Sequence, residues 1–334
     1  MLRFSRPIRT SYGSISDREL LLLSLTEDGL CGRGEAAPLE PYDGVSVRDV
    51  RTALDAHRGV LEDSAGQPRD ERLAACQAVS DLPQALAAVD VALCELEALR
   101  AGRPLAAWLC DAPLAAVAVS ALVDAEDPAA VADRAADAAR QGFACLKVKV
   151  GTGEDLKRVR AVRAAAGPEV GLVLDANGAW SVDQAAQALG ELAAAQPELV
   201  EEPVSGLAAL KELRPRTPLA LAIDETAADP DALAAGVADA VCLKLSRCGG
   251  VSGLLEAAAV ARAAGSRVYL GSTYDGPLGI AATLHAAAAL HPDHPCGLAT
   301  LGLFADLGDL APAALQLAAR AGQITVPRRP GLGV

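Results

Sequence analysis

Five short apolar runs in the middle of the sequence carry charged residues where a buried strand should have none. Burying an ionised side chain costs several kcal/mol unless the charge is paired or bound to a metal, so such charges are seldom accidental. The charged residues are Lys147 and Lys149, Asp175, Glu201, Asp224 and Lys244. We therefore interpret the five runs as parts of one site.

The carboxylates of this set predict a metal site. Asp175, Glu201 and Asp224 come from three consecutive runs, and their negative charges would repel one another unless a cation lay among them. A set made only of oxygen ligands, with no His or Cys, suits Mg²⁺ better than zinc, with Mn²⁺ as an alternative.

The lysines predict acid and base chemistry around that metal. Lys147 and Lys149 are two residues apart, so in a strand they face the same way, and Lys244 follows four runs later. A metal that binds a substrate carboxylate stabilises the enediolate formed when the adjacent carbon loses its proton, and a nearby Lys can be the base. A neighbouring cation lowers a lysine pKa and neighbouring carboxylates raise it, and the sequence leaves this balance open.

These residues must be positioned by a repeating strand and helix pattern. Ala-rich helical patterns fill most of the gaps between eight apolar runs, which is the number that closes a parallel α/β barrel. A doubly wound open sheet is the alternative, but no Gly-rich phosphate turn follows the first strand. The runs begin near residues 116, 145, 171, 199, 220, 240, 267 and 296. We expect a TIM-type (β/α) barrel over residues 111–303, in which the Lys pair and Lys244 lie on opposite sides of the ring.

The two ends of the chain predict an attachment to this barrel. Residues 1–110 contain a strand meander and three helical patterns, which indicate an α+β module, and residues 6–13 are a loop candidate. Residues 304–334 are weakly patterned, and we expect this segment to pack back on the N-terminal module. The helical patterns cover residues 46–61, 69–79 and 83–100.

Five motifs in this order resemble the muconate-lactonising-enzyme subgroup of the enolase superfamily. They are Lys-Val-Lys, Asp-Ala-Asn, Glu-Glu-Pro, Asp-Glu-Thr and the Lys-Leu-Ser-Arg-Cys-Gly-Gly that begins at Lys244. The stretch from Gly32 to Pro38 resembles the Gly-x-Gly-Glu segment of that family's capping domain. The resemblance covers nearly the whole chain and implies a modified TIM barrel closed by an N-terminal α+β capping domain and a C-terminal segment.

The resemblance also implies a role for each site residue. Asp175, Glu201 and Asp224 would hold the metal, and Lys149 and Lys244 would form the acid and base pair. Lys147 would pair with the substrate carboxylate. Asn177 and Glu225 would support the metal ligands from behind.

The last part of the barrel suggests which reaction follows proton removal. The segment from Gly271 to Ala282 resembles the seventh-strand segment of o-succinylbenzoate synthases, and residues 294–304 resemble their eighth strand. An Asp-x-Asp that dipeptide epimerases use on the eighth strand for a substrate ammonium group is missing. We therefore favour dehydration of the cyclohexadiene precursor to o-succinylbenzoate, in menaquinone synthesis. Candidate substrate contacts are Ser272, Thr273, Tyr274 and Asp275.

Other functions stay open at this point. An N-acyl amino acid racemase or dipeptide epimerase is the next candidate, followed by a muconate-type cycloisomerase and an uncharacterised acid-sugar enzyme of the same group. A metal-binding scaffold with the same fold is the non-enzymatic alternative. It is disfavoured because a structural metal site needs only the carboxylates and not the two opposed lysines.

Bulk composition narrows the partners. The net charge of −13 disfavours nucleic acid and anionic membrane surfaces, which leaves a small carboxylate substrate. The chain has no apolar signal core and no long uncharged span, so we expect a cytoplasmic protein. The eight Cys are scattered without a CxxC pair, which favours reduced buried thiols over disulfides or a zinc site. A homo-oligomer is compatible with the sequence, which leaves the oligomeric state open.

Overall fold

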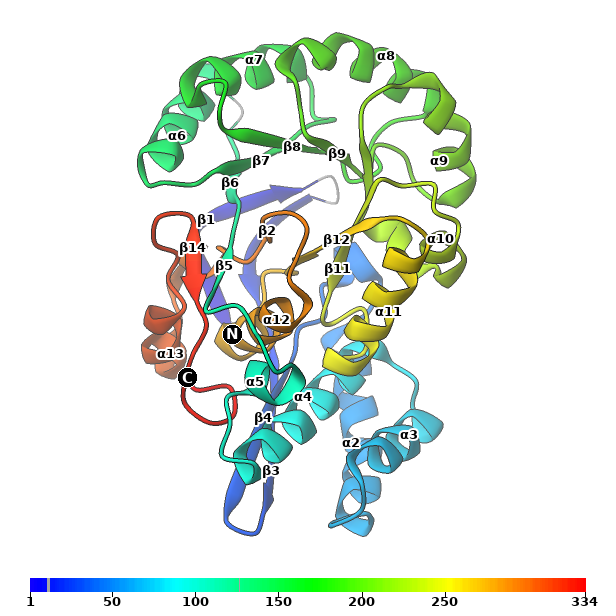
Figure 1. The fold of residues 1–334 in the computed structure, drawn as a ribbon, viewed down its shortest axis with the longest axis vertical. Coiled ribbons are helices and arrows are strands. Elements are labelled where there is room, and N and C mark those ends of the chain that lie inside the picture. Colours follow the sequence, from blue (N-terminus) through cyan, green and yellow to red (C-terminus); the bar gives the residue numbers. More distant parts are fainter. Residues whose placement is uncertain (11–12, 126) are drawn as a thin grey trace.

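A curled parallel sheet of seven strands forms the centre of the molecule (Figure 1). The computed structural model describes residues 1–10, 13–125 and 127–334. In this sheet the strands lie side by side in chain order, as in a parallel barrel. The strands are β6 (Ala121–Val123), β7 (Cys145–Lys149), β8 (Gly171–Asp175), β9 (Leu199–Glu201), β10 (Leu221–Ile223), β11 (Ala240–Lys244) and β12 (Arg267–Gly271).

The segment around Cys296 completes the ring. Cys296 forms a parallel bridge with Val119, just before β6, and Gly297 forms one with Gly271 at the end of β12. This segment therefore occupies the place of an eighth strand, although its pairing is limited to these isolated bridges.

Helices follow the strands and cover the outside of the sheet (Figure 1). Local sequence explains where several begin: the Asp127 side chain caps one helix, and Ser181 forms a capping box with Gln184 at another. The helices are α6 (Pro128–Arg140), α7 (Asp155–Ala166), α8 (Val182–Leu192), α9 (Leu207–Leu213), α10 (Pro230–Ala234), α11 (Val251–Ala263) and α12 (Pro277–Leu290), with short 3-10 turns at Ala193–Ala195, Arg214–Arg216 and Glu225–Ala228.

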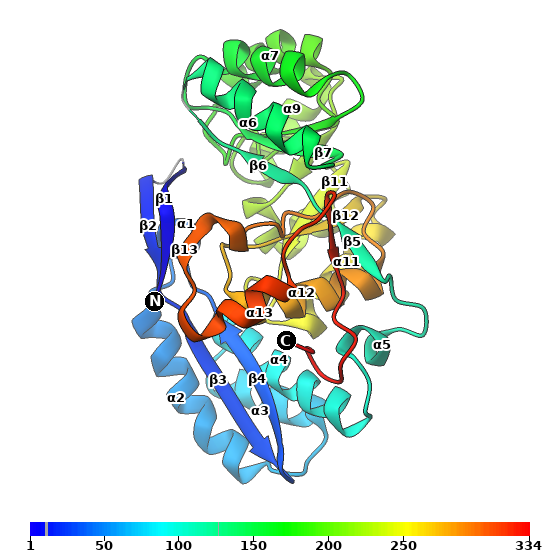
Figure 2. The ribbon, with the colours of Figure 1, turned by 90° about the vertical axis from the view of Figure 1, so that its left-hand side faces the viewer.

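The N-terminal part forms a cap of two hairpins and several helices on one side of the barrel (Figure 2). The β3–β4 hairpin turns at Asp28 and Gly29, which both have positive φ, as a tight hairpin turn requires. The elements are β1 (Leu2–Thr10), β2 (Gly13–Arg18), β3 (Leu21–Glu27), β4 (Leu30–Ala36), α1 (Glu40–Asp43), α2 (Val47–Asp63), α3 (Arg69–Val79), α4 (Pro83–Arg100) and α5 (Leu105–Leu109).

The glycines of the Gly-x-Gly-Glu segment let β4 lie directly on α4. A Cβ at Gly34 would come within 1.9 Å of the Ala88 carbonyl oxygen, and one at Gly32 within 2.1 Å of the Ala92 carbonyl oxygen. No side chain fits in that space. The two glycines therefore set how closely the cap's hairpin packs on its longest helix.

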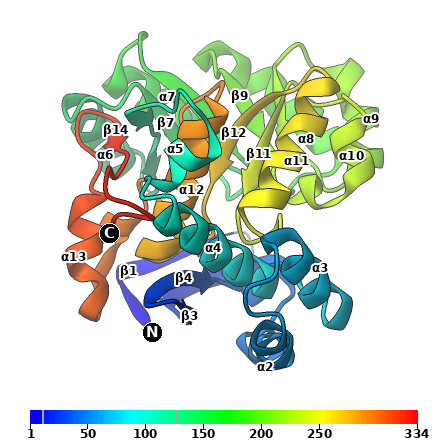
Figure 3. The same ribbon diagram turned by 60° about the horizontal axis from the view of Figure 1, so that its bottom comes forward.

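Helix α4 also joins the cap to the barrel (Figure 3). Its Asp90 carboxylate accepts hydrogen bonds from the backbone N–H and the hydroxyl of Ser252, at 2.9 and 2.8 Å, in the first turn of α11. Arg69 of α3 donates to the same hydroxyl at 3.0 Å. A carboxylate at a helix N-terminus accepts hydrogen bonds from N–H groups that have no partner within the helix. Asp90, a residue of the N-terminal part, therefore does this for the barrel helix α11.

The C-terminal segment runs along both parts of the molecule. One of its strands pairs with β1 and another with β5 (Ala116–Ala118), both antiparallel. Its end reaches α4, where the backbone N–H of Leu332 donates to Glu95. The elements of this segment are β13 (Phe304–Asp306), α13 (Ala311–Gln316) and β14 (Gln323–Thr325), with 3-10 turns at Leu301–Leu303 and Gly308–Leu310.

The expected α/β barrel with an N-terminal α+β cap is confirmed, and two details of the prediction were wrong. The run near 116 is not the first barrel strand: β5 pairs with β14, and the parallel sheet begins at β6. Residues 6–10 belong to β1 rather than to a loop, and Pro7 falls where the β1–β2 pairing shifts register, a place that tolerates proline. Residues 11 and 12 of that predicted loop lie outside the described residues. Among the described helices, none has the length and apolar character needed to cross a bilayer.

Candidate active site

The predicted charged residues meet at the C-terminal end of the barrel strands. Lys149, Asp175 and Glu201 are direct neighbours across β7, β8 and β9. Asp224 directly follows β10, and Lys244 ends β11. All six predicted charged residues line one cavity. The register of the parallel strands therefore places these charged side chains next to one another, as the spacing in the sequence predicted.

On one side of the cavity, two lysines contact two carboxylates. Lys147 Nζ lies 2.6 Å from Glu201 Oε1 and 2.9 Å from Asp175 Oδ2. Lys149 Nζ lies 2.6 Å from Asp175 Oδ2 and donates at the same distance to Asn177 Oδ1. Lys147 and Lys149 share one face of β7 because side chains alternate along a strand.

On the other side, Lys244 contacts a carboxylate and a tyrosine of the cap. Its Nζ lies 2.6 Å from Asp224 Oδ2 and donates to the Tyr42 hydroxyl at 2.8 Å. The Tyr42 hydroxyl in turn donates to Asp224 Oδ1 at 2.8 Å. Because β7 and β11 are four strands apart in the sheet, the two lysine groups face each other across the carboxylates.

The neighbouring carboxylates raise the pKa of both lysines of β7. Burial lowers the pKa of Lys149, and the charge of Lys147 lowers it further, but the charge and hydrogen bond of Asp175 together with Tyr274 leave that pKa above the ordinary lysine value. Lys147 follows the same pattern, through Asp175 and Glu201. Both lysines are therefore protonated when the carboxylates face them directly, and a cation that engaged the carboxylates would shift this balance the other way.

The carboxylate cluster fits a hard divalent cation. Burial raises the pKa of Glu201 to about 7, and although Lys147 opposes this, Asp175 and Asp224 add to it. One ligand atom each of Glu201, Asp224 and the neighbouring Cys242 lies within 4.8 Å of the others. Glu201 and Asp224 offer oxygen ligands in this group, and Asp175, which contacts Lys147 together with Glu201, offers another. Oxygen ligands suit Mg²⁺ or Mn²⁺, and Cys242 is an adjacent thiol that the sequence prediction did not include.

Asn177 and Glu225 support this cluster from behind. Asn177 has a left-handed backbone with φ of 46°, its N–H donates to Asp175 Oδ1, and its side chain donates to Glu225 Oε1 at 2.9 Å. Glu202, which the prediction did not place, is buried and accepts hydrogen bonds from the backbone N–H groups of Asp224 and Thr226. These contacts fix the backbone that presents Asp224.

The substrate-contact candidates divide into two groups. Ser272, Thr273 and Tyr274 line the cavity, but Asp275 does not. The Asp275 carboxylate is buried and accepts a hydrogen bond of 2.7 Å from the Thr273 hydroxyl. Tyr274 has a left-handed backbone with φ of 58°, so the chain turns there and Asp275 does not continue along the cavity wall.

The cavity has a charged floor and a largely apolar mouth. Its space is about 950 Å³, including the part open to solvent. The cap contributes Ile15, Leu39 and Pro41, and the segment that completes the ring contributes Ala299 and Thr300. The Thr300 and Ser272 hydroxyls lie 3.1 Å apart, so this wall offers neutral polar groups.

Sequence reasoning missed Tyr42 and Tyr269. The Tyr269 hydroxyl donates to Glu201 Oε2 at 2.7 Å. Tyr269 lies two residues before Gly271 on β12, so strand alternation could have placed it inside the barrel. No such pattern marks Tyr42 in the sequence. It lies in the short cap helix α1, and its partner Lys244 is 202 residues away along the chain.

Comparison with known families identifies the class of this fold and site. Residues 130–334 match the family described as "Enolase C-terminal domain-like". The chain therefore belongs to the enolase superfamily and is an enzyme of that class. Residues 2–109 match "Mandelate racemase / muconate lactonizing enzyme, N-terminal domain", which identifies the subgroup. The predicted resemblance is thus confirmed.

Individual relatives catalyse different reactions. An o-succinylbenzoate synthase of Mycobacterium ulcerans is 41% identical over 223 residues, covering 60% of this chain and 66% of that protein, just under two thirds of its length. Muconate cycloisomerase 1 of Rhodococcus opacus is 31% identical over 350 residues, covering 98% of this chain and 91% of that protein. Among solved structures, the L-Ala-D/L-Glu epimerase of Bacillus subtilis has a TM-score of 0.91 at 28% identity, covering 99% of this chain and 95% of that one.

A structure with a bound metal is also similar. The dipeptide epimerase of Enterococcus faecalis, complexed with Mg and L-Leu-L-Tyr, has a TM-score of 0.90 at 26% identity, covering 99% of this chain and 96% of that one. The fold and the superfamily are therefore shared with enzymes of at least three specificities.

Proposed function

We propose that the protein removes a proton from the carbon next to a substrate carboxylate, with Mg²⁺ held by Asp175, Glu201 and Asp224. The observation that carries this proposal is the pair of lysine groups facing each other across three buried carboxylates. A bound divalent cation would neutralise the negative charge that develops on the substrate carboxylate as the proton leaves.

The residues of this chain take separate parts in that reaction. Lys149 is the base, because it faces the cavity and is oriented by Asn177. Lys147 provides a fixed positive charge for the substrate carboxylate. Lys244, on the opposite wall, is the acid. The hydroxyl of Tyr42 holds its amine in place, and Asn177 and Glu225 hold the ligand cluster.

For the specific reaction we propose dehydration of the cyclohexadiene precursor to o-succinylbenzoate, as in menaquinone synthesis. The partial match to the mycobacterial synthase supports it. The eighth-strand segment contributes Pro295, Gly297, Ala299 and Thr300 to the cavity and no acidic residue. A carboxylate on this segment would pair with a substrate ammonium group, so its absence there favours a substrate without one.

Epimerisation or racemisation of an N-acylated amino acid or a dipeptide is the second candidate. It is favoured by the solved epimerase structures, which cover 99% of this chain. Cycloisomerisation of a muconate is the third, because the Rhodococcus enzyme matches along 98% of the chain. All three begin with the same functional groups and differ in how the second half of the reaction is completed.

The test is incubation of the protein with Mg²⁺ in deuterated water, with the synthase substrate, N-acyl amino acids and dipeptides in parallel. We expect dehydration of the synthase substrate and its loss in Lys149→Ala, while Lys211→Ala on the exposed side of α9 retains activity. Exchange of the alpha proton of amino acid derivatives without dehydration would establish the epimerase reaction instead. Neither exchange nor elimination with any substrate would contradict the proposed chemistry.

A further inference from the structure

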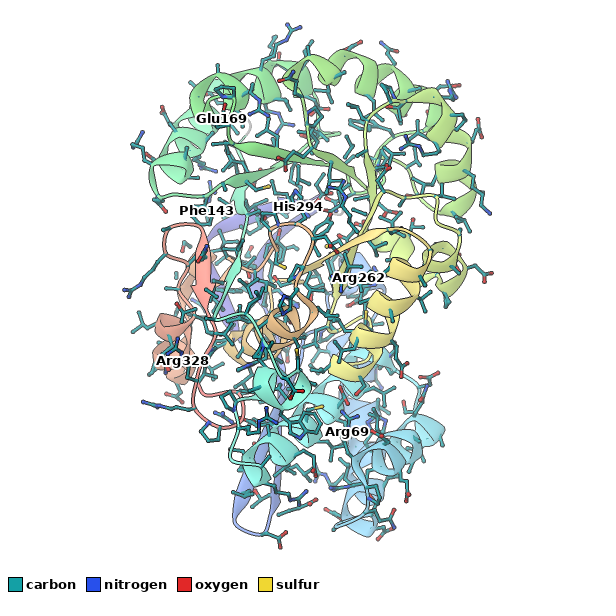
Figure 4. The ribbon with its side chains drawn as sticks, in the orientation of Figure 1. Arg69, Phe143, Glu169, Arg262, His294 and Arg328 are labelled. Carbon is teal, nitrogen blue, oxygen red and sulfur yellow. The ribbon has the colours of Figure 1, made fainter. Side chains whose placement is uncertain are left out.

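Three residues with metal-ligating side chains meet at the opposite end of the barrel from the active site. One ligand atom each of Cys145, Glu198 and His294 lies within 4.8 Å of the others. Cys145 is the first residue of β7, and Glu198 directly precedes β9. His294 precedes the segment that completes the ring, and Figure 4 shows it among the barrel elements near the centre of the view.

The position of Cys145 follows from strand alternation. It shares its face of β7 with Lys147 and Lys149, so its thiol points into the barrel, four residues before Lys149. A strand rises about 3.3 Å per residue, which places Cys145 roughly 13 Å along β7 from Lys149 and about 7 Å from Lys147. The two sites therefore lie at opposite mouths of one barrel.

The cluster is enclosed on one side and open on the other. Cys145 is 1% exposed and His294 is 8% exposed, whereas the Glu198 side chain is 52% exposed. The Glu198 carboxylate lies over Gly171, where a Cβ would come within 2.6 Å of its Oε2. A glycine thus makes room for this carboxylate, and its exposed edge gives solvent and ions a way in.

The histidine is oriented as a ligand. Its Nδ1 lies 3.3 Å from the carbonyl oxygen of Pro295, and its Nε2 lies 3.1 Å from Glu198 Oε2. In the tautomer that carries its proton on Nδ1, the Nε2 lone pair is directed toward the Glu198 carboxylate, as two ligands of one metal ion would be. Metal-binding histidines commonly donate their other N–H to a backbone carbonyl in this way.

We propose that Cys145, His294 and Glu198 bind a thiophilic transition-metal ion at the N-terminal mouth of the barrel, with Zn²⁺ as the expected ion. Sulfur, imidazole nitrogen and carboxylate oxygen are the usual zinc ligands, and a water from the open side would complete a tetrahedral site. On binding, the Cys145 S–H bond breaks, its proton goes to solvent and the thiolate coordinates the metal. The all-oxygen catalytic cluster, by contrast, selects a hard cation.

Protons compete with the metal at this site. Burial raises the pKa of the Cys145 thiol to about 12, with Glu198 adding to the effect and Lys147 opposing it. A metal ion deprotonates a coordinating thiol outright, so binding should release a proton and strengthen as pH rises. The ordinary alternative, an ion pair between His294 and Glu198 with Cys145 as a packing residue, predicts no thiolate.

The test is titration of the full-length protein with Co²⁺ in excess Mg²⁺, under reducing conditions. We expect one equivalent to produce near-ultraviolet absorption from a thiolate bound to cobalt, and Zn²⁺ to displace it. Cys145→Ser should abolish the band. Cys242→Ser, which changes the thiol beside the catalytic carboxylates, should leave it unchanged.

Two further variants keep the test decisive if Cys145→Ser does not fold. Glu198→Gln changes an exposed side chain, and Gly171→Ala displaces the flexible carboxylate without altering any ligand; each should weaken Co²⁺ binding at least tenfold. A wild-type protein without a thiolate band would overturn the proposal. So would a band that persists in Glu198→Gln and Gly171→Ala at full affinity, or one that depends on Cys242 instead.

Discussion

The two walls of the catalytic cavity are built in different ways. The barrel wall carries charged groups at fixed strand positions, each held by a partner, such as Lys149 on Asp175. The cap wall is largely apolar, with Ile15, Leu39 and Pro41. Its Tyr42 hydroxyl donates a hydrogen bond to Asp224 among the charged residues of the barrel. Under the proposed function, the barrel would carry the chemistry and the cap would determine which substrate fits beneath it.

Removing the base should have the largest effect. In Lys149→Ala we expect turnover to fall by roughly 100- to 10,000-fold, the usual contribution of a general acid or base, while the protein still folds and binds Mg²⁺. The measurement is kcat with the best substrate, alongside Mg²⁺ affinity by calorimetry. Wild-type turnover in this variant would show that the barrel wall does not supply the base.

Removing the hydroxyl of Tyr42 should have a smaller effect. Tyr42→Phe keeps the ring over Lys244 but loses the hydrogen bonds to Lys244 and Asp224. Hydrogen bonds to charged groups contribute about 1.5 to 3 kcal/mol, so we expect at least a tenfold loss in kcat. The pH profile should shift as well, which a merely structural change would not cause. If kcat and the pH profile of Tyr42→Phe were unchanged, the Tyr42 hydroxyl of the cap would have no role in the reaction.

The junction between cap and barrel should respond to pH. Burial raises the pKa of Glu35 to about 7, with Asp275 adding to the effect, and Glu35 accepts a hydrogen bond from the backbone N–H of Gly276. The pKa of Glu35 is higher in the folded than in the unfolded protein, so the protonated carboxyl favours folding. This stabilisation is fully present below pH 4.5 and is lost as pH rises to about 7.

Glu35→Gln should therefore raise the melting temperature at pH 8 by a few degrees, corresponding to about 1 to 2 kcal/mol. The difference should disappear at pH 5, where wild-type Glu35 is mostly protonated. The measurement is thermal unfolding of both proteins across this range. A constant difference between the two proteins at every pH would contradict the assignment to this carboxyl.

Changing the apolar rim should have the smallest effect. Ile15→Ala removes apolar contact at the mouth, and a lost contact of this size is worth about 1 kcal/mol. We expect KM to rise a few-fold with kcat nearly unchanged, and Ile15→Val to lie between. A large loss of kcat would mean that this cap residue takes part in the chemistry. It would contradict the proposed division of roles between the barrel wall and the cap wall.

The barrel wall was predictable because strand periodicity fixes which side chains share a face. Charged residues in apolar runs therefore predict from the sequence alone that Lys149, Asp175 and Glu201 share one site. The cap wall was not predictable, because the contact of Tyr42 with Lys244 joins residues 202 positions apart. The candidate contact Asp275 does not line the cavity, because the left-handed backbone of Tyr274 turns the chain there. A sequence alone does not show that turn.

The contact of Asp90 with the first turn of α11 has a consequence for how the chain holds together. A barrel excised from its cap would lose the carboxylate that satisfies the N-terminal donors of α11, and this helix follows the strand that ends in Lys244. Cap and barrel should therefore unfold in one cooperative transition rather than as separate modules. A chimera that exchanges caps between family members would have to carry a matching acid on α4, or its barrel would lose order next to the very lysine it needs.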